Sequence, residues 1–313
     1  MSSPKETKKI RIIFMGTPEF SLPGLQALIE DKSFEIVGIF TQPDKPIGRK
    51  QILTPPPVKV LANEHHLPVF QPEKIKSEIE NIINLVPDLI VVIAYGKIIP
   101  QTILDIPTYG CINVHASLLP KYRGAACLNA PILNGDIETG VTIMKMEAGL
   151  DTGPILRQSK MALNGKETLA DAHNTLSELG AKILPETLHD WIDKKIEPQM
   201  QDDTQASFIK TLSKEDGKIN WEKSAEEIER MVRAYNPWPG TWAELNGEII
   251  KILNVKNEVV EGKKTEIGKL FLDNGNLLIQ CGQNALTILE LQLAGKKAMS
   301  AKEFINGYKD KIK

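Results

Sequence analysis

Three polar residues have types and spacing that could support acyl transfer. Asn113 and His115 are two positions apart in a stretch that begins as a strand, so on an extended chain their side chains point to the same face. An imidazole can accept a proton near neutral pH, and a carboxamide N–H can stabilise the oxyanion that forms at an attacked carbonyl. Asp151, in a loop between Gly149 and Gly153, could orient the imidazole or hold its positive charge.

The same residues also admit a structural interpretation, in which Asn113 and His115 satisfy each other in the core and Asp151 is a turn residue. As a catalytic set they require no activated serine or cysteine. Ser117 is near, but Cys111 sits in an apolar strand, where a core role is expected. The set therefore favours direct transfer of an acyl group to an amine over a covalent enzyme intermediate.

Alternating strands and helices in the first part of the chain would bring these residues to one sheet edge. Runs of β-branched and aromatic residues predict strands at 10–15, 34–41, 88–95 and from Gly110. This order predicts an α/β fold with a Rossmann-like, doubly wound, mostly parallel sheet. Because sites lie at the carboxyl ends of such strands, we expect Gly16, Tyr95–Gly96 and His115 to open onto one edge.

Two connections between strands of this sheet have distinctive sequences. After the first strand, Gly16-Thr17-Pro18 predicts a tight turn into a helix that runs to about Glu30, with Thr17 as its N-cap. It is not a GxGxxG fingerprint, so a dinucleotide site is not favoured. The segment from Gln42 to Pro57 is long for such a connection and carries Lys45, Arg49 and Lys50. From the residues alone, a functional loop and a solvated surface loop are both open.

The length of 313 residues predicts two domains. We expect a catalytic domain over 1–195, a polar linker over 196–206 and a C-terminal domain over 207–313. In that last domain a helix at 225–235 and five short alternating strands predict a small OB-like β-barrel. Its 17 basic and 15 acidic residues permit contact with a polyanion but do not require it.

Composition narrows the class of protein. No apolar run approaches the roughly 20 residues that span a bilayer, and residues 1–9 lack an apolar signal core. Three widely spaced cysteines favour a reducing compartment over a disulfide framework. We therefore expect a cytoplasmic protein of a bacterium. No CxxC or HExxH motif occurs, so no metal is expected.

The motifs Asn113–Pro120, Arg123–Ala126 and Gly149–Gly153 resemble those of the formyltransferases that use 10-formyltetrahydrofolate. The resemblance runs from about Ile10 to Tyr308. Matches in the inserted 42–57 segment and at Asn236-Pro237-Trp238-Pro239 favour the branch that formylates methionine on initiator tRNA. It implies transfer of a formyl group from 10-formyltetrahydrofolate to the amino group of methionyl initiator tRNA, for translation initiation, by a protein expected to be a monomer.

The resemblance also implies roles for particular residues. Asn113 and His115 would polarise the formyl group and stabilise its tetrahedral intermediate, and Asp151 would position His115 and assist proton removal from the amine. The residues expected to line the pterin pocket are Ile93, Ala94, Tyr95, Gly96, Ser117, Leu118, Leu119, Pro120 and Leu150. The residues expected to bind tRNA are Lys45, Arg49, Lys50, Lys296 and Lys297, with Arg49 reaching into the acceptor end.

One departure from the family pattern and two alternatives remain. We expect a helix over 125–134 that borders the site, and within it Cys127-Leu128-Asn129 stands where the family usually has Pro-Ile-Gln. A formyltransferase of the same fold could act on a small amine, such as a nucleotide sugar or a purine precursor, although the inserted loop and the block from Asn236 to Trp242 count against it. A non-catalytic RNA-binding protein would give no reason for Asn113, His115 and Asp151 to occur together.

Overall fold

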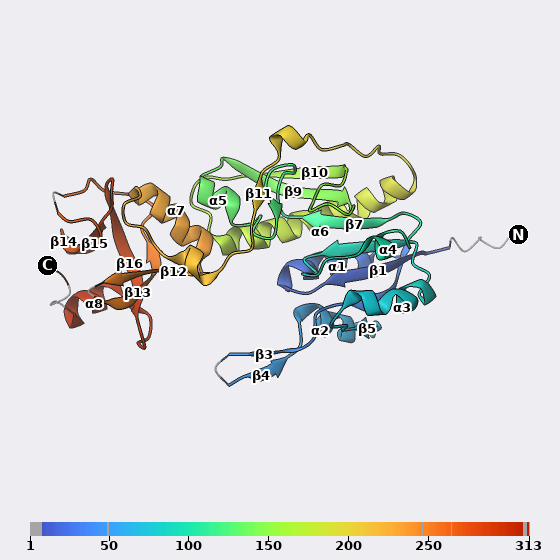
Figure 1. Cartoon of the computed structure of the whole chain (residues 1–313), viewed down its shortest axis with the longest axis horizontal. Helices are drawn as coiled ribbons and strands as arrows, with labels where there is room; N and C mark the ends of the chain where they lie inside the picture. Colours follow the sequence, from blue (N-terminus) through green and yellow to red (C-terminus); the bar gives the residue numbers. More distant parts are fainter. Residues whose placement is uncertain (1–7, 49, 246, 264, 309–311, 313) are drawn as a thin grey trace, which may run out of the picture. The chain divides into compact units, whose positions relative to one another are not determined.

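The computed structural model describes residues 8–48, 50–245, 247–263, 265–308 and 312. The chain forms two compact units (Figure 1). The first comprises Met1–Cys127, Thr139–Met161 and His173–Phe208, and the second comprises Leu128–Glu138, Ala162–Ala172 and Ile209–Lys313. The second unit thus includes two stretches that precede the expected linker in sequence.

A seven-stranded sheet in the order β10-β9-β7-β6-β1-β2-β5 organises the first unit. Its strands are β1 (Ile10–Gly16), β2 (Phe34–Phe40), β5 (Val69–Phe70), β6 (Leu89–Ile93), β7 (Cys111–His115), β9 (Glu138–Lys145) and β10 (Ile155–Ala162). Neighbours from β7 to β5 pair in parallel, and β9 runs antiparallel to β7. The predicted doubly wound, mostly parallel sheet is confirmed. The central strand β6 is buried throughout, as its β-branched run requires.

The helices of this unit follow the expected alternation with shorter bounds. They are η1 (Glu19–Ser21), α1 (Leu22–Glu30), α2 (Pro57–Glu64), η2 (Ile75–Glu78), α3 (Ile79–Asn84), α4 (Gln101–Leu104) and α6 (Leu169–Ile192), whose first four residues belong to the second unit. The prediction that Thr17 caps the first helix is wrong. The chain enters through η1, and the Thr17 hydroxyl donates instead to the Tyr95 carbonyl at 3.1 Å.

The segment expected as a long loop contains an antiparallel hairpin, β3 (Lys45–Ile47) and β4 (Ile52–Thr54). Figure 1 shows this hairpin extending away from the sheet of the first unit. Its apolar side chains are mostly exposed, at 59% for Ile47, 62% for Ile52 and 64% for Leu53. A two-stranded hairpin with exposed side chains has no buried face. Its sequence therefore shows no alternation of apolar and polar residues from which the strands could be predicted.

The expected linker is held against the first unit. Gln199 exchanges two backbone hydrogen bonds with Ile155, each 2.8 Å long. After the turn η3 (Asp203–Gln205), the Ser207 carbonyl accepts from the Arg123 amide at 2.8 Å, where β8 (Arg123–Gly124) pairs with β11 (Phe208–Ile209). We call residues 199–208 the strap.

An antiparallel sheet of six strands forms the second unit, with five in the order β12-β13-β16-β15-β14 and β17 beside β16. The strands are β12 (Thr241–Leu245), β13 (Glu248–Val255), β14 (Leu270–Asp273), β15 (Asn276–Gln280), β16 (Ala285–Leu293) and β17 (Met299–Ser300). The helices are α5 (Ala130–Asn134), η4 (Lys214–Gly217), α7 (Ala225–Tyr235) and α8 (Ala301–Gly307). The predicted C-terminal β domain is confirmed.

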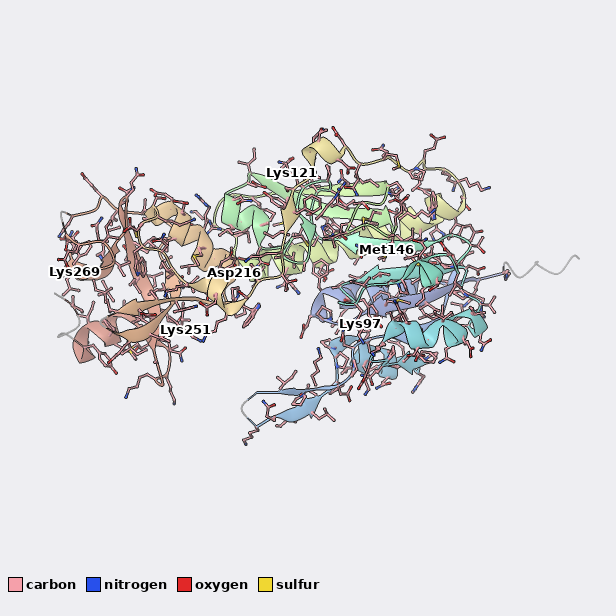
Figure 2. The ribbon with its side chains drawn as sticks, in the orientation of Figure 1. Lys97, Lys121, Met146, Asp216, Lys251 and Lys269 are labelled. Carbon is pink, nitrogen blue, oxygen red and sulfur yellow. The ribbon has the colours of Figure 1, made fainter. Side chains whose placement is uncertain are left out.

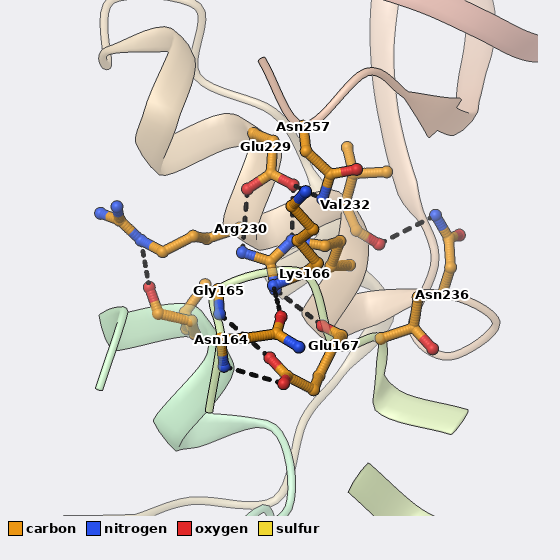
Figure 3. A network of polar contacts seen from close by, with 12 residues as sticks. Asn164, Gly165, Lys166, Glu167, Glu229, Arg230, Val232, Asn236 and Asn257 are labelled. Atoms are coloured by element: carbon orange, nitrogen blue, oxygen red, sulfur yellow. Dashed lines mark hydrogen bonds and ion pairs between the residues drawn. The ribbon is translucent and has the colours of Figure 1, made fainter. Parts of the chain in front are cut away.

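A polar network in the second unit joins α7 to the 164–167 turn (Figure 3). Arg233 forms a two-pronged ion pair with the buried carboxylate of Glu229 and donates to the Glu167 carbonyl at 2.7 Å. The Glu167 carboxylate accepts from the amides of Asn164 and Gly165 at 2.8 and 3.1 Å.

The helix expected at 125–134 begins only at Ala130, and its residues pack in the core of this unit.

Within the described residues, no helix is both long and apolar enough to cross a membrane. The same part of the chain contains no group of three or more His, Cys, Asp or Glu residues arranged to hold a metal ion.

Candidate active site

The carboxyl ends of three adjacent parallel strands, β1, β6 and β7, lie side by side at the sheet edge where a site is expected. In the sheet register, Gly16 at the end of β1 lies opposite Ile93 at the end of β6, and Val92 lies opposite Asn113 of β7. His115 ends β7 two residues later, so its side chain shares a face with that of Asn113. The half-buried Asn113 therefore presents its amide on the same side of the sheet as the imidazole.

The His115 imidazole is 6% exposed and is held from both sides. Its Nε2 lies 3.0 Å from the Tyr122 carbonyl oxygen; because a carbonyl only accepts, Nε2 carries a proton. Its Nδ1 faces Oδ2 of Asp151 at 3.7 Å, which is an ion-pair distance and longer than a hydrogen bond. The same Oδ2 accepts from the Gly124 amide at 2.8 Å, so the carboxylate is fixed beside the ring.

The groups packed around the imidazole determine the charge on the ring. Burial opposes protonation of His115, but the Cys127 sulfur, the Asp151 carboxylate and the Tyr122 carbonyl outweigh it and raise its pKa to about 9. At neutral pH the ring is then an imidazolium, which can donate to a developing oxyanion rather than accept a proton. Cys127, the departure from the family pattern, therefore contacts His115 itself.

The turn after β6 presents backbone beside this pair. Ala94 and Gly96 have φ values of 48° and 77°, and both are exposed, whereas the Tyr95 side chain between them is buried. A left-handed residue other than glycine is uncommon, so Ala94 requires support from its surroundings. The carbonyl of the next residue, Tyr95, accepts hydrogen bonds from the Thr17 hydroxyl and from the Gln42 side-chain amide, each at 3.1 Å, and these bonds hold the turn in place.

The loop after β7 supplies the other candidate pterin contacts. Ser117 is buried and donates to the carbonyl of Lys121, labelled in Figure 2, at 2.7 Å. Leu119 is buried, with its amide donating to Thr142 at 3.1 Å, whereas Leu118 and Pro120 are half-buried. The structure therefore brings the turn after β6 and the loop after β7 to neighbouring strand ends.

Leu150 lies beside Asp151 in the chain, and its side chain is 60% exposed. It is a large apolar side chain at the rim of the polar pair, and such a side chain gains stability when a flat ligand covers it.

The residues expected to bind tRNA lie in both units. Lys45 and Lys50 are exposed on the β3–β4 hairpin, and Lys296 and Lys297 are exposed in the turn after β16 of the second unit. Arg49 lies outside the described residues. Near the hairpin, Lys97 (Figure 2) donates to the Glu73 carbonyl at 2.7 Å, and burial together with the charge of Lys45 lowers its pKa.

Two glutamines and one buried arginine that contact the candidate site were not predicted from the sequence. Gln42 spans the Tyr95 and Gly96 carbonyls, Gln201 contacts the Asp151 loop, and Arg123 is only 2% exposed. Nothing in its immediate sequence distinguishes Gln201 from a surface residue, and only the fold brings it to the site. Gln42 begins the inserted 42–57 segment in which family matches lie, but its contact with the turn after β6 comes from the fold. Arg123 could have been found from the sequence, because it is the first residue of the Arg123–Ala126 motif that resembles the family.

Comparison with known proteins identifies the class that this fold and site define. Residues 8–188 match the formyl transferase family, and residues 211–309 match the formyl transferase C-terminal domain. The chain belongs to the formyl transferase family.

Two relatives of the chain are named after one particular formyl transfer. The methionyl-tRNA formyltransferase of Citrifermentans bemidjiense is 47% identical over 302 residues, covering 96% of this chain and 94% of the relative. That of Geobacter sulfurreducens is 45% identical over 303 residues, with the same coverage. Among solved structures, an N-formyltransferase from Helicobacter canadensis in complex with folinic acid and dTDP-3-aminofucose has a TM-score of 0.67 at 20% identity, over 89% of this chain and 99% of that one. That likeness is one of fold.

Proposed function

We propose that this protein transfers the formyl group of 10-formyltetrahydrofolate to the amino group of methionine carried by initiator tRNA, which yields formylmethionyl-tRNA for translation initiation. The observation that carries the proposal is the His115–Asp151 pair at the sheet edge beside Asn113. Extended similarity to methionyl-tRNA formyltransferases, over 96% of the chain, supports the tRNA substrate.

The turn and loops around the pair fit a folate. A pterin is flat and carries donors and acceptors along its edge, which suits exposed backbone such as that of Ala94 and Gly96. The exposed Leu150 provides an apolar surface for the ring. We propose that Ile93–Gly96, Ser117–Pro120 and Leu150 hold the folate, which when bound supplies an activated formyl carbon, and that no metal takes part.

Each polar residue then has a defined task. The His115 imidazolium and the Asn113 amide donate hydrogen bonds to the formyl oxygen as negative charge develops there. Asp151 holds the charge of the imidazolium from 3.7 Å and accepts a proton that the amine loses as its nitrogen bonds to the formyl carbon. The bond from that carbon to N10 of the folate then breaks, and N10 takes up one proton and leaves as the amine of tetrahydrofolate. Because the donors act directly on the oxygen, no covalent enzyme intermediate is needed.

The tRNA would be gripped through its backbone. We propose that Lys45 and Lys50 contact phosphates, that Arg49 reaches into the acceptor end, and that Lys296 and Lys297 contribute from the C-terminal domain. In functional terms we retain a catalytic domain over 1–195, a linker over 196–206 and a tRNA-binding domain over 207–313. Because the two relatives compared above are bacterial, we propose that the protein acts in the bacterial cytoplasm, as a monomer.

The test compares three acceptors at equal folate concentration: methionyl initiator tRNA, free methionine and a nucleotide-sugar amine. We expect formylation of the tRNA-bound methionine and none of the sugar within the same time. Formylation of the sugar alone would overturn the proposal and establish the small-amine alternative.

A further inference from the structure

The strap carries one side chain, Gln201, whose whole hydrogen-bonding capacity is used at the edge of the candidate site. Its Oε1 accepts from Nε and from a terminal nitrogen of Arg123, at 3.1 and 2.8 Å. Its Nε2 donates to the carbonyls of Asp151 and Gly153, at 2.8 and 2.7 Å. An arginine offers only donors and a carbonyl only accepts, so these four contacts fix the orientation of the amide without ambiguity.

The loop that Gln201 grips needs such support. Asp151 has a φ of 52°, in the left-handed region where a residue other than glycine is strained by roughly 1–3 kcal/mol. Gly153 lies so close to the Lys145 carbonyl that an added Cβ would stand 1.8 Å from its oxygen, so the loop has no room to relax inward. The two donated hydrogen bonds therefore hold the Asp151 backbone in a conformation that its intrinsic preference disfavours.

Arg123 is the anchor of this arrangement. Its guanidinium is buried at 3% exposure and contacts Gln201, the Phe208 ring and the exposed carboxylate of Asp203, the last at 2.7 Å. A buried arginine costs free energy unless its donors are paired, so the pairing with Gln201 is strongly held. Its own backbone neighbours, Tyr122 and Gly124, contact His115 and Asp151.

We propose that Gln201, oriented by Arg123, is a positioning residue for Asp151, and that the strap is therefore part of the catalytic apparatus rather than a passive connection. This inference rests on the proposed formyl transfer, because it assigns Gln201 a role through Asp151. Displacement of the Asp151 carboxylate from Nδ1 of His115 weakens both the charge that supports the imidazolium and the acceptor for the amine proton.

Gln201→Glu separates this role from simple anchoring of the strap. A carboxylate keeps the acceptor that Arg123 requires and gains an ion pair, so the strap stays docked. The variant loses the two N–H donors of Gln201, and its carboxylate oxygen repels the carbonyl oxygens of Asp151 and Gly153. The matched control is Gln199→Glu, the same substitution two residues away at an exposed side chain.

The experiment makes three measurements on the wild type and both variants: the thermal midpoint, steady-state kinetics with methionyl-tRNA (kcat and KM), and the pKa of His115 by NMR titration of its ring. We expect Gln201→Glu to keep the midpoint within a few degrees and to lower kcat at least tenfold with KM for tRNA within twofold. Because Arg123 neutralises the new carboxylate, displacement of Asp151 should also lower the His115 pKa by at least half a unit. Gln199→Glu should match the wild type in all three.

An unchanged kcat and an unchanged His115 pKa in Gln201→Glu would overturn the inference, as would an equal loss of kcat in the control. A wild type that does not formylate tRNA would instead refute the proposed function. Because the NMR titration needs no substrate, it would still decide whether Gln201 positions Asp151 against His115.

Discussion

Oδ2 of Asp151 accepts a hydrogen bond from the Gly124 amide at 2.8 Å and stands 3.7 Å from Nδ1 of His115. The carboxylate is thus fixed by backbone, and it faces the imidazole as a charge rather than as a hydrogen-bond partner. This arrangement leaves Nδ1 available to donate to another atom, which a tight His–Asp hydrogen bond would prevent.

Asp151→Asn tests that electrostatic role. The asparagine keeps an oxygen for the Gly124 amide but loses the negative charge, so the His115 pKa should fall below about 9. We expect kcat to fall at least a hundredfold with little change in the KM for tRNA. NMR titration of the His115 ring and steady-state kinetics measure the two effects. A His115 pKa equal to that of the wild type would contradict a charge-based role.

The raised pKa of His115 also predicts how stability depends on pH. Its value of about 9 in the folded protein lies above the roughly 6.5 of an unfolded chain. Protonation therefore stabilises the fold fully below about pH 6.5, and this contribution is lost as the pH rises through 9. The difference in unfolding free energy between wild type and His115→Gln should fall across this window by on the order of 3 kcal/mol. Denaturant titrations at pH 6 and pH 9.5 measure it; a constant difference would contradict the raised pKa.

The parallel sheet and the C-terminal strands were predictable because their signals are local. Helix α7 begins after Ser224, whose capping box with Glu227 appears directly in the sequence, and its predicted bounds are confirmed. The buried run of β6 likewise predicts a central strand. The hairpin was missed because its short strands are exposed, so neither propensity nor periodicity marks them.

The candidate site was only partly predictable, for a physical reason. The i, i+2 relation of Asn113 and His115 follows from strand geometry, and glycines on either side of Asp151 indicate a turn. The contacts of Gln201 with Asp151 join residues 50 apart in the chain, and those of Gln42 with Tyr95 join residues 53 apart. A polar strap without apolar period is indistinguishable from a free linker in sequence, because its stability comes from hydrogen bonds to distant backbone.

The β3–β4 hairpin should contribute to tRNA binding through charge. Lys45→Ala with Lys50→Ala removes two exposed cations, so the KM for tRNA should rise several-fold while kcat changes less than twofold. If both contact phosphates, the slope of log KM against log salt should fall by about 1.4–1.8. Lys195→Ala, at an exposed lysine paired with Asp193, is the control and should leave the slope unchanged. An unchanged slope in the double variant would mean that the hairpin does not bind tRNA phosphates and is a solvated surface segment.

Gly153→Ala should damage the site through sterics alone. The new Cβ would meet the Lys145 carbonyl oxygen at 1.8 Å, so the backbone that carries Asp151 must shift. We expect a loss of roughly 1–3 kcal/mol in stability and at least a tenfold fall in kcat. Gly307→Ala, where nothing lies within 4 Å of the added carbon, should leave both unchanged. Normal kcat in Gly153→Ala would show that the loop tolerates displacement.

Gln42→Leu should affect the folate rather than the tRNA. Its amide donates to the carbonyls of Tyr95 and Gly96 at 3.1 and 3.3 Å, and so it supports the turn proposed to hold the pterin. Leucine fills a similar volume without donors, so the left-handed Ala94 loses part of its support. We expect the KM for 10-formyltetrahydrofolate to rise about five- to tenfold, the effect of about one lost hydrogen bond. The KM for tRNA should stay within twofold. An equal rise in both KM values would mean that Gln42 supports the fold in general. A role confined to the turn cannot weaken the binding of folate and of tRNA to the same extent.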